Sequence, residues 1–175
     1  DLAGEYYGLT AEQMATMLLF NPVDVPVFDG KDSPRKSVTW IPGHRFGDGL
    51  RGPVTRYRVM AIGKAPGMDE WRARRNFVGQ SGRLLRELAS ELDYDISQWY
   101  VTNLVRFLPP DGGKTLNKHH IQDSMCLLAQ EIAIVRPEHI ILFGSDAVKA
   151  MFGKKATLEK FRANVFFMRG IRALG

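Results

Sequence analysis

Three short segments of the sequence carry residue types that could hold a ligand. The first is Gly63-Lys64-Ala65-Pro66-Gly67, which directly follows a β-rich run. Its two glycines and its proline fix a tight turn whose backbone amides could face a bound molecule. Turns of this kind are common after strands, so this motif alone favours an ordinary turn by about two to one.

The second segment, residues 76–82, reads NFVGQSG and precedes a helical pattern. Phe77 would stack on a nucleic-acid base if it were exposed beside this loop. The loop backbone could approach a phosphate near the helix N-terminus at Gly79, Gln80, Ser81 and Gly82. A core position for Phe77, with glycines that only start the helix, explains the same spacing equally well.

The third segment is Thr102-Asn103, at the end of the strand-like run WYVTNLV. An Asn side chain offers a hydrogen-bond donor and an acceptor, and this pair can match one edge of a pyrimidine. An Asn that only satisfies a turn is the commoner case. The three segments are individually weak, and their value depends on whether the fold brings them together.

Strand-like and helical patterns alternate from residue 57 onward. Short β-rich runs predict strands at 57–62, 99–105, 139–143 and 164–168. Apolar periodicity predicts helices at 80–92, 118–135, 146–152 (capped by Ser145) and within 157–163. Leu84, Leu85, Leu88 and Leu92 share one face of the first helix. The alternation predicts an α/β fold, a three-layer α/β/α sandwich around a four-stranded parallel sheet.

Ligands of such sheets bind beyond the carboxyl ends of the strands. Segments 63–79, 103–114 and 143–147 should therefore meet at one rim. Residues 1–56 look different, with a helical pattern at 10–20 and then a proline-rich arm that predicts little regular structure. We therefore expect an N-terminal helix and extended arm over 1–56 and a folded domain over 57–175.

The combined motifs are far more specific than any one of them. GKAPG, NFVGQSGRLL, VTNLVRFLPP and RPEHIILFGSDAVKAMFG occur in this order. Together they resemble the uracil-DNA glycosylase superfamily, and most closely the branch that carries an iron–sulfur cluster. That branch reads roughly GEAPG, PFVGxAGxLL, a strand ending in TN, a proline pair, and a strand closing in LG before a helix with Ala.

The resemblance implies hydrolysis of the bond between uracil and deoxyribose in DNA repair. The nucleotide must leave the stack, at a cost of a few kcal/mol, and the enzyme then stabilises charge on the departing base. Phe77 resembles the residue that stacks on the flipped base, Asn103 the amide that reads it, and Gly79, Ser81 and Gly82 the loop that grips phosphate. The base would be held by Asn103, Phe77 and the 63–67 turn.

The departures from the family pattern concern catalysis. Lys64 stands where the family has the Glu that helps to place the attacking water, and Asp69 or Glu70 could substitute for it. Phe107 and Ser124 stand at two cluster-cysteine positions. A late His-Pro motif does not appear between Met168-Arg169-Gly170 and Gly175, so the C-terminal part of the domain looks incomplete. The catalytic candidates are Asn103, Lys64, Asp69 and Glu70.

Charge favours a polyanionic partner without proving one. The formal net charge is +5, and Arg72, Arg74 and Arg75 cluster before the glycine loop, where phosphate contacts are the better interpretation. Ser145, in a helix-start position, joins them as a candidate DNA contact. We expect DNA, single-stranded or containing uracil, as the partner.

Composition excludes several kinds of site. Cys126 is the only cysteine, so no internal disulfide can form and one thiol cannot ligate a cluster. The four histidines lack partners at metal-binding spacing, so we expect no metal and no cofactor. No run is long enough for a membrane span. We expect a monomer inside a cell, in the cytoplasm of a bacterium or a phage-infected host.

Two functions remain open at this level. One is an enzyme that excises uracil or a related modified base, with impaired activity. The other is a non-catalytic glycosylase-fold module that binds DNA or docks on a DNA polymerase. Phe77 and Asn103 favour the enzyme, whereas Lys64 and the missing His favour the module.

Overall fold

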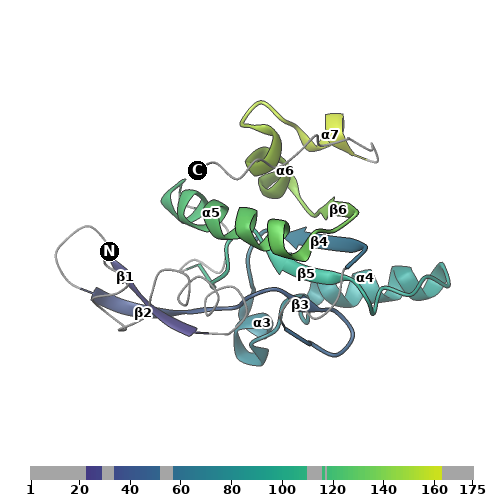
Figure 1. Cartoon of the computed structure of the whole chain (residues 1–175), viewed down its shortest axis with the longest axis horizontal. Helices are drawn as coiled ribbons and strands as arrows, with labels where there is room; N and C mark the ends of the chain where they lie inside the picture. The colour runs from purple at the N-terminus through teal and green to yellow at the C-terminus, as the bar shows by residue number, and fades with distance from the viewer. Residues whose placement is uncertain (1–22, 29–33, 52–56, 110–115, 117, 163–175) are drawn as a thin grey trace.

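A four-stranded sheet with strand order β3-β5-β4-β6 forms the centre of the chain (Figure 1). In the computed structural model, the described residues are 23–28, 34–51, 57–109, 116 and 118–162. Strands β4 (Val59–Gly63), β5 (Tyr100–Asn103) and β6 (His139–Leu142) run parallel. Strand β3 (His44–Arg45) pairs antiparallel with β5. The sheet is therefore mostly parallel with one antiparallel edge.

The helices cover both faces of this sheet, as the alternating pattern predicts. They are α3 (Met68–Ala73), α4 (Gln80–Glu91), α5 (Lys118–Val135), α6 (Ser145–Phe152) and α7 (Leu158–Phe161). Met60 and Ile62 of β4 pack with Leu128 and Ile132 of α5 on one face. Ala61, between them, packs with Ala89 of α4 on the other face, because successive strand side chains point to opposite sides. The predicted α/β/α sandwich is confirmed (Figure 1).

The described sheet contains one strand, β3, that the sequence did not predict. The expected strand at 164–168 lies outside the described residues, as does the expected helix at 10–20. The edge position next to β5 is taken by β3, a strand of the N-terminal arm that the sequence did not predict. A two-residue strand has too few residues to show a period-two pattern, so the sequence did not reveal it.

The prediction that the arm has little regular structure is wrong. Strands β1 (Val23–Phe28) and β2 (Pro34–Trp40) pair as an antiparallel hairpin before β3. Two of the prolines that suggested a loop lie within it: Pro34 starts β2 and Pro26 lies in β1, and each strand of this two-stranded sheet has a free edge. The division of the chain at residue 57 stays a prediction, although β3 shows that the arm contributes to the same sheet.

The leucine-rich face of α4 is largely exposed, whereas Ala89 and Gly82 are buried. Leu84, Leu88 and Leu92 are 54%, 47% and 76% exposed. Gly82 is buried because the helix start packs closely against the Phe77 backbone, and Ala89 belongs to the core cluster on this side. Helical periodicity was therefore recognised correctly, but the leucines alone did not identify the side that faces the core.

The start of α6 is also shifted by one position. Ser145 is the first helical residue, exposed, and the N-cap is Gly144 with φ of 90°. This φ suits a glycine and strains other residues, so Ser145 is not the cap. None of the helices in the described part of the chain combines the length and the apolar character that crossing a bilayer requires.

A buried polar cluster joins α5 to the arm. The Arg106 guanidinium contacts Glu131 at 2.5 Å, and both side chains are fully buried. The Tyr100 hydroxyl and the Gly43 amide both donate to Glu131 Oε1, at 2.7 and 3.1 Å. Burial and the Glu131 carboxylate raise the pKa of Tyr100 well above its usual value, so the phenol stays a donor. This cluster holds the segment before β3 against the sheet.

Candidate functional site

The carboxyl ends of β4 and β5 lie side by side, which brings two of the predicted segments together. Gly63 is in register with Asn103. The Leu104 amide donates to the Gly63 carbonyl at 2.8 Å, and the Val105 amide donates to the Lys64 carbonyl at 3.0 Å. The 63–67 turn therefore lies directly beside the end of the Asn103 strand.

The third predicted segment reaches the same rim. The Phe143 amide donates to the Ile62 carbonyl at 2.9 Å. Its ring meets the Phe77 ring edge-on, with centroids 5.7 Å apart. Lys64 Nζ lies 3.1 Å from Asp146 Oδ2 in the first turn of α6. The prediction that the three segments meet at one rim is confirmed for their described residues.

Gly63, Phe77 and Asn103 form the closest part of this site. A Cβ atom added at Gly63 would lie 2.4 Å from Asn103 Oδ1 and 3.0 Å from Phe77 Cζ. Any other residue at position 63 would therefore displace one of these two side chains. The glycine of the turn is required by this close approach, and not by a positive φ.

Phe77 is buried, with only 6% of its surface exposed. Of the two positions that the sequence allowed, the structure therefore shows the core position and not the exposed one. Its ring packs between Gly63 and Phe143. Its φ of 57° places a bulky side chain in the left-handed region, at a cost of roughly 1–2 kcal/mol. Strained backbone of this kind concentrates at functional sites.

Close packing explains why Gly79 and Gly82 follow Phe77. A Cβ at Gly82 would lie 1.7 Å from the Phe77 carbonyl oxygen, and one at Gly79 would lie 2.8 Å from Glu70. Both glycines are buried, whereas Gln80 and Ser81 are exposed in the first turn of α4. That turn has no acidic residue and no side-chain cap, so its amides suit an anion.

Glu70 joins the two loops of the site. Its Oε2 accepts from the Gly67 amide at 3.1 Å, and its Oε1 accepts from the Gly79 amide at 2.6 Å. Both oxygens are thus occupied by backbone donors. Asp69 is exposed and lies 3.7 Å from an Arg83 nitrogen. In the 63–67 turn, Ala65 packs against the core and Pro66 is buried.

Two residues of the site, Asn76 and His44, were missed by the sequence predictions. Asn103 Nδ2 donates to Asn76 Oδ1 at 2.8 Å, and Asn76 Nδ2 donates to the Pro42 carbonyl at 2.8 Å. The Asn76 amide donates to His44 Nε2 at 2.8 Å. One signal for Asn76 was available, because it stands where the motif that this segment resembles has proline. The role of His44 carried no sequence signal.

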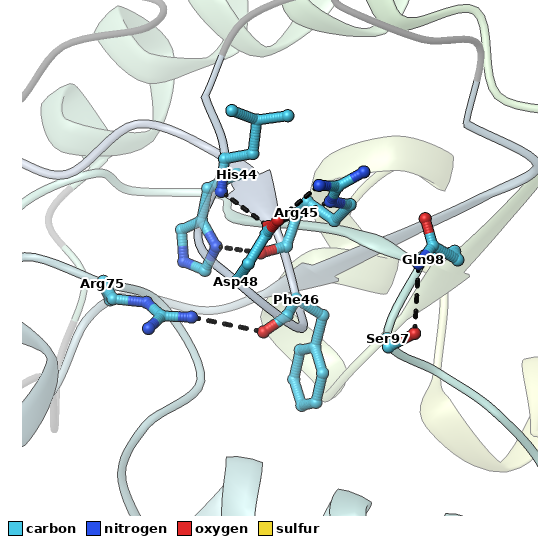
Figure 2. A network of polar contacts seen from close by, with 8 residues as sticks. His44, Arg45, Phe46, Asp48, Arg75, Ser97 and Gln98 are labelled. Atoms are coloured by element: carbon cyan, nitrogen blue, oxygen red, sulfur yellow. Dashed lines mark hydrogen bonds and ion pairs between the residues drawn. The ribbon is translucent and has the colours of Figure 1, made fainter.

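The bonds of His44 define its protonation. A backbone amide can only donate, so Nε2 is unprotonated and the proton lies on Nδ1, which donates to the Arg45 carbonyl at 2.8 Å (Figure 2). Burial, together with the charges of Arg75 and Arg51 and against the hydrogen bonds to Arg45 and Asn76, lowers the pKa of His44 from its usual 6.5 to about 4. The ring is neutral at physiological pH.

The three candidate arginines differ in their surroundings. Arg72 is exposed in the last turn of α3. Arg74 lies over the Trp71 ring at 5.5 Å, and its carbonyl accepts from Arg51 at 2.6 Å. Arg75 donates to the Phe46 carbonyl at 3.4 Å, next to His44 (Figure 2). Arg74 and Arg75 thus also fasten α3 to the arm, whereas Arg72 faces solvent.

The residues present do not fit an iron–sulfur cluster. Phe107 is buried and packs on Trp40 with ring centroids 6.3 Å apart. Ser124 is fully buried, and Cys126 is exposed. Clusters are ligated by thiolates, and neither position supplies one. Within the described residues, no three His, Cys, Asp or Glu side chains are grouped so that they could hold a metal ion.

Comparison with known proteins supports the motif interpretation. The family model of the Uracil DNA glycosylase superfamily matches residues 51–171. A type-4 uracil-DNA glycosylase of Pyrobaculum aerophilum is 38% identical over 93 residues, which are 53% of this chain and 47% of that protein. One of Thermotoga maritima is 33% identical over 108 residues, which are 61% of this chain and 56% of that protein.

An α/β/α sandwich with its candidate site at the carboxyl rim therefore carries the motifs of a base-excising class of proteins. The chain belongs to the uracil-DNA glycosylase superfamily, and its relatives are of the type-4 branch. The matched segments span about half the length of these relatives.

Proposed function

We propose that this chain binds DNA and hydrolyses the N-glycosidic bond of uracil, or of a related modified base, with impaired activity. The convergence of Gly63, Phe77 and Asn103 at the carboxyl rim carries this proposal, because the side chains of Phe77 and Asn103 both lie close against Gly63. Asn103 would read the flipped base through its amide, and Phe77 would stack on it. The 63–67 turn would lie beneath the base.

The proposed DNA contacts are the exposed groups around this rim. Gln80 and Ser81 start an uncapped helix, Ser145 starts another, and Arg72 is exposed nearby in the chain. Phosphates of a single strand, or of a uracil-containing duplex, would be held there. The surrounding backbone would be held in place by Arg74, Arg75, Gly79 and Gly82.

The proposed impairment has a physical basis in the charges at the site. Lys64 is paired with Asp146, and an ammonium group has no lone pair with which to orient water. Glu70 already accepts two backbone hydrogen bonds. Asp69 is exposed beside Arg83 and is the remaining candidate acid. Losing one charge-stabilising group typically costs a hundredfold to a thousandfold in rate.

A second candidate function is a non-catalytic module that binds DNA, or docks on a polymerase, through the same fold. The Lys64–Asp146 pair favours it, since a cation occupies the position of the water-placing acid. Location in the cytoplasm of a bacterium or of a phage-infected cell is part of both proposals.

The test is a gel assay with single-stranded, uracil-containing DNA followed by alkaline cleavage of abasic sites. We expect slow or no product, and any product should be lost in Asn103→Ala but kept in Gln98→Ala, an exposed amide elsewhere. Lys64→Glu should not restore full activity, because the new carboxylate would face Asp146. Robust multiple turnover by the unmodified chain would contradict the impairment. Binding without product would support the module.

A further inference from the structure

We infer that Asn76 is a positioning residue that fixes the orientation of the Asn103 amide and so determines which pyrimidine edge the site accepts. The inference rests on the proposed function of Asn103 as the base-reading amide. It adds a determinant of specificity from a residue that would itself touch no base. The three hydrogen bonds that connect Pro42, Asn76, Asn103 and His44 provide the argument.

The orientation is set from a backbone carbonyl. The Pro42 oxygen can only accept, so the Asn76 side chain must present Nδ2 to it, at 2.8 Å. Asn76 Oδ1 then faces Asn103, and only Asn103 Nδ2 can pair with it, at 2.8 Å. Each amide could be reversed on its own, but the carbonyl at the start of the series permits one arrangement.

The Pro42 carbonyl is itself fixed by hydrogen bonds of the residues before and after it. The Ile41 amide donates to the Arg106 carbonyl at 2.7 Å, and the Gly43 amide donates to Glu131 at 3.1 Å. The Asn76 backbone is fixed separately by its bond to His44 Nε2. All of these residues are buried. Reversing Asn103 would place two carbonyl oxygens against each other away from water, which is unfavourable.

This arrangement leaves Asn103 with its Oδ1 acceptor and one N–H donor, and Oδ1 lies over Gly63. The uracil edge presents a ring N–H donor beside carbonyl acceptors, which matches that pattern. The cytosine edge presents a ring nitrogen acceptor beside an amino donor, and it would require the reversed amide. Asn76 therefore favours uracil-type edges. A proline at position 76, as in the resembled motif, could supply neither the amide nor the backbone N–H.

The test compares binding to two single-stranded oligonucleotides, which carry one 2′-fluoro-2′-deoxyuridine or one 2′-fluoro-2′-deoxycytidine to resist hydrolysis. Wild-type protein should prefer the uridine. Asn76→Ala should lower this preference about tenfold, the worth of one net hydrogen bond. Asn76→Asp should keep it, because a carboxylate oxygen still accepts from Asn103 Nδ2, although it no longer donates to Pro42.

Thermal unfolding of the same variants separates positioning from support of the fold. If Asn76 only braced Pro42, both variants would lose stability alike and the preference would not follow the chemistry of residue 76. A preference that survives in Asn76→Ala but is lost in Asn103→Ala overturns this inference alone. A wild-type protein with no preference, or one unaffected by Asn103→Ala, overturns the proposed function as well.

A measurement on the unmodified protein tests the inference even if the variants fail to fold. The side-chain amide of Asn103 should exchange slowly with solvent in NMR spectra of the unmodified protein. The exposed Gln98 amide supplies the fast reference within the same sample. Equal exchange rates for the two amides would overturn the inference.

Discussion

His44 illustrates how burial and hydrogen bonding set the state of a single residue. Its ring accepts from Asn76 and donates to Arg45, so the neutral form satisfies both nitrogens. A second proton would remove the acceptor that Asn76 needs and would place a charge in a buried site near Arg75 and Arg51. Protonation of His44 at low pH would therefore break its hydrogen bond to Asn76, the residue that binds the Asn103 side chain.

We expect this coupling to make stability depend on pH. Because the folded pKa of His44 is about 4 and the usual value is 6.5, the unfolded chain binds the extra proton first as pH falls. The contribution of His44 should be complete above pH 6.5 and decrease down to about pH 4. At most about 3.5 kcal/mol is involved, from roughly 1.4 kcal/mol per pKa unit over the shift from 6.5 to about 4.

Urea unfolding of wild type and His44→Gln between these pH values checks this. The variant should be less stable near neutrality and should show a smaller change across the range. His139→Gln is the matched control, since His139 is exposed at the start of β6 and should leave the slope as in wild type. An equal slope in His44→Gln would contradict the assignment.

At the scale of the elements, α5 is joined to the arm and to β5 through one buried carboxylate. Glu131 accepts from Arg106, Tyr100 and Gly43, and a Cβ at Gly43 would lie 2.3 Å from the Tyr100 ring. The cluster therefore fixes the approach of the arm to the sheet. Through Pro42 and His44, it also supports the loop that holds Asn76.

Removing the charge of Glu131 should be strongly destabilising. In Glu131→Gln, Arg106 remains buried without a counter-charge, and breaking one partner of a buried pair costs about 3–5 kcal/mol. Glu138→Gln removes the partner of the exposed Arg58 and should cost less than about 1 kcal/mol. Denaturant unfolding measures both values. A similar loss in the two variants would show that the buried cluster does not brace the arm.

At the scale of the whole molecule, the two rims of the sheet differ. The carboxyl rim gathers the 63–67 turn, the Phe77 loop, Asn103 and the start of α6. At the opposite rim, β6 begins directly after Arg136 and Glu138. Glu138 forms an ion pair there with Arg58. The opposite rim therefore offers exposed charged residues that lie away from the proposed DNA contacts.

Arg72→Glu should weaken binding to all DNA sequences alike and lower the slope of log affinity against log salt by about one, as expected for one phosphate contact. We prefer this site to reversals at Arg74 and Arg75, whose side chains also contact the Trp71 ring and the Phe46 carbonyl. Arg136→Glu, exposed on the opposite rim, is the charge-matched control. Salt titrations of binding should separate the two, and equal effects would place the DNA contacts elsewhere.

The sequence by itself determined the alternation of strands and helices and the order of motifs along them. Apolar periodicity is a local property, so β4, β5, β6, α4 and α5 could be located within one or two residues of their observed bounds. The rule that parallel strands end at one rim then brought Gly63, Asn103 and the α6 start together before any contact was known. The resemblance of the motifs identified the superfamily.

Only the tertiary structure decided what these residues do to one another. The burial of Phe77 against Gly63 and Phe143 and the pairing of Lys64 with Asp146 depend on segments far apart in the chain. The same holds for β3 and for His44, which the arm delivers to the edge of the sheet and to the Asn76 loop. Hydrogen bonds and charges act through space over a few ångströms, and residue types along the chain do not contain those distances.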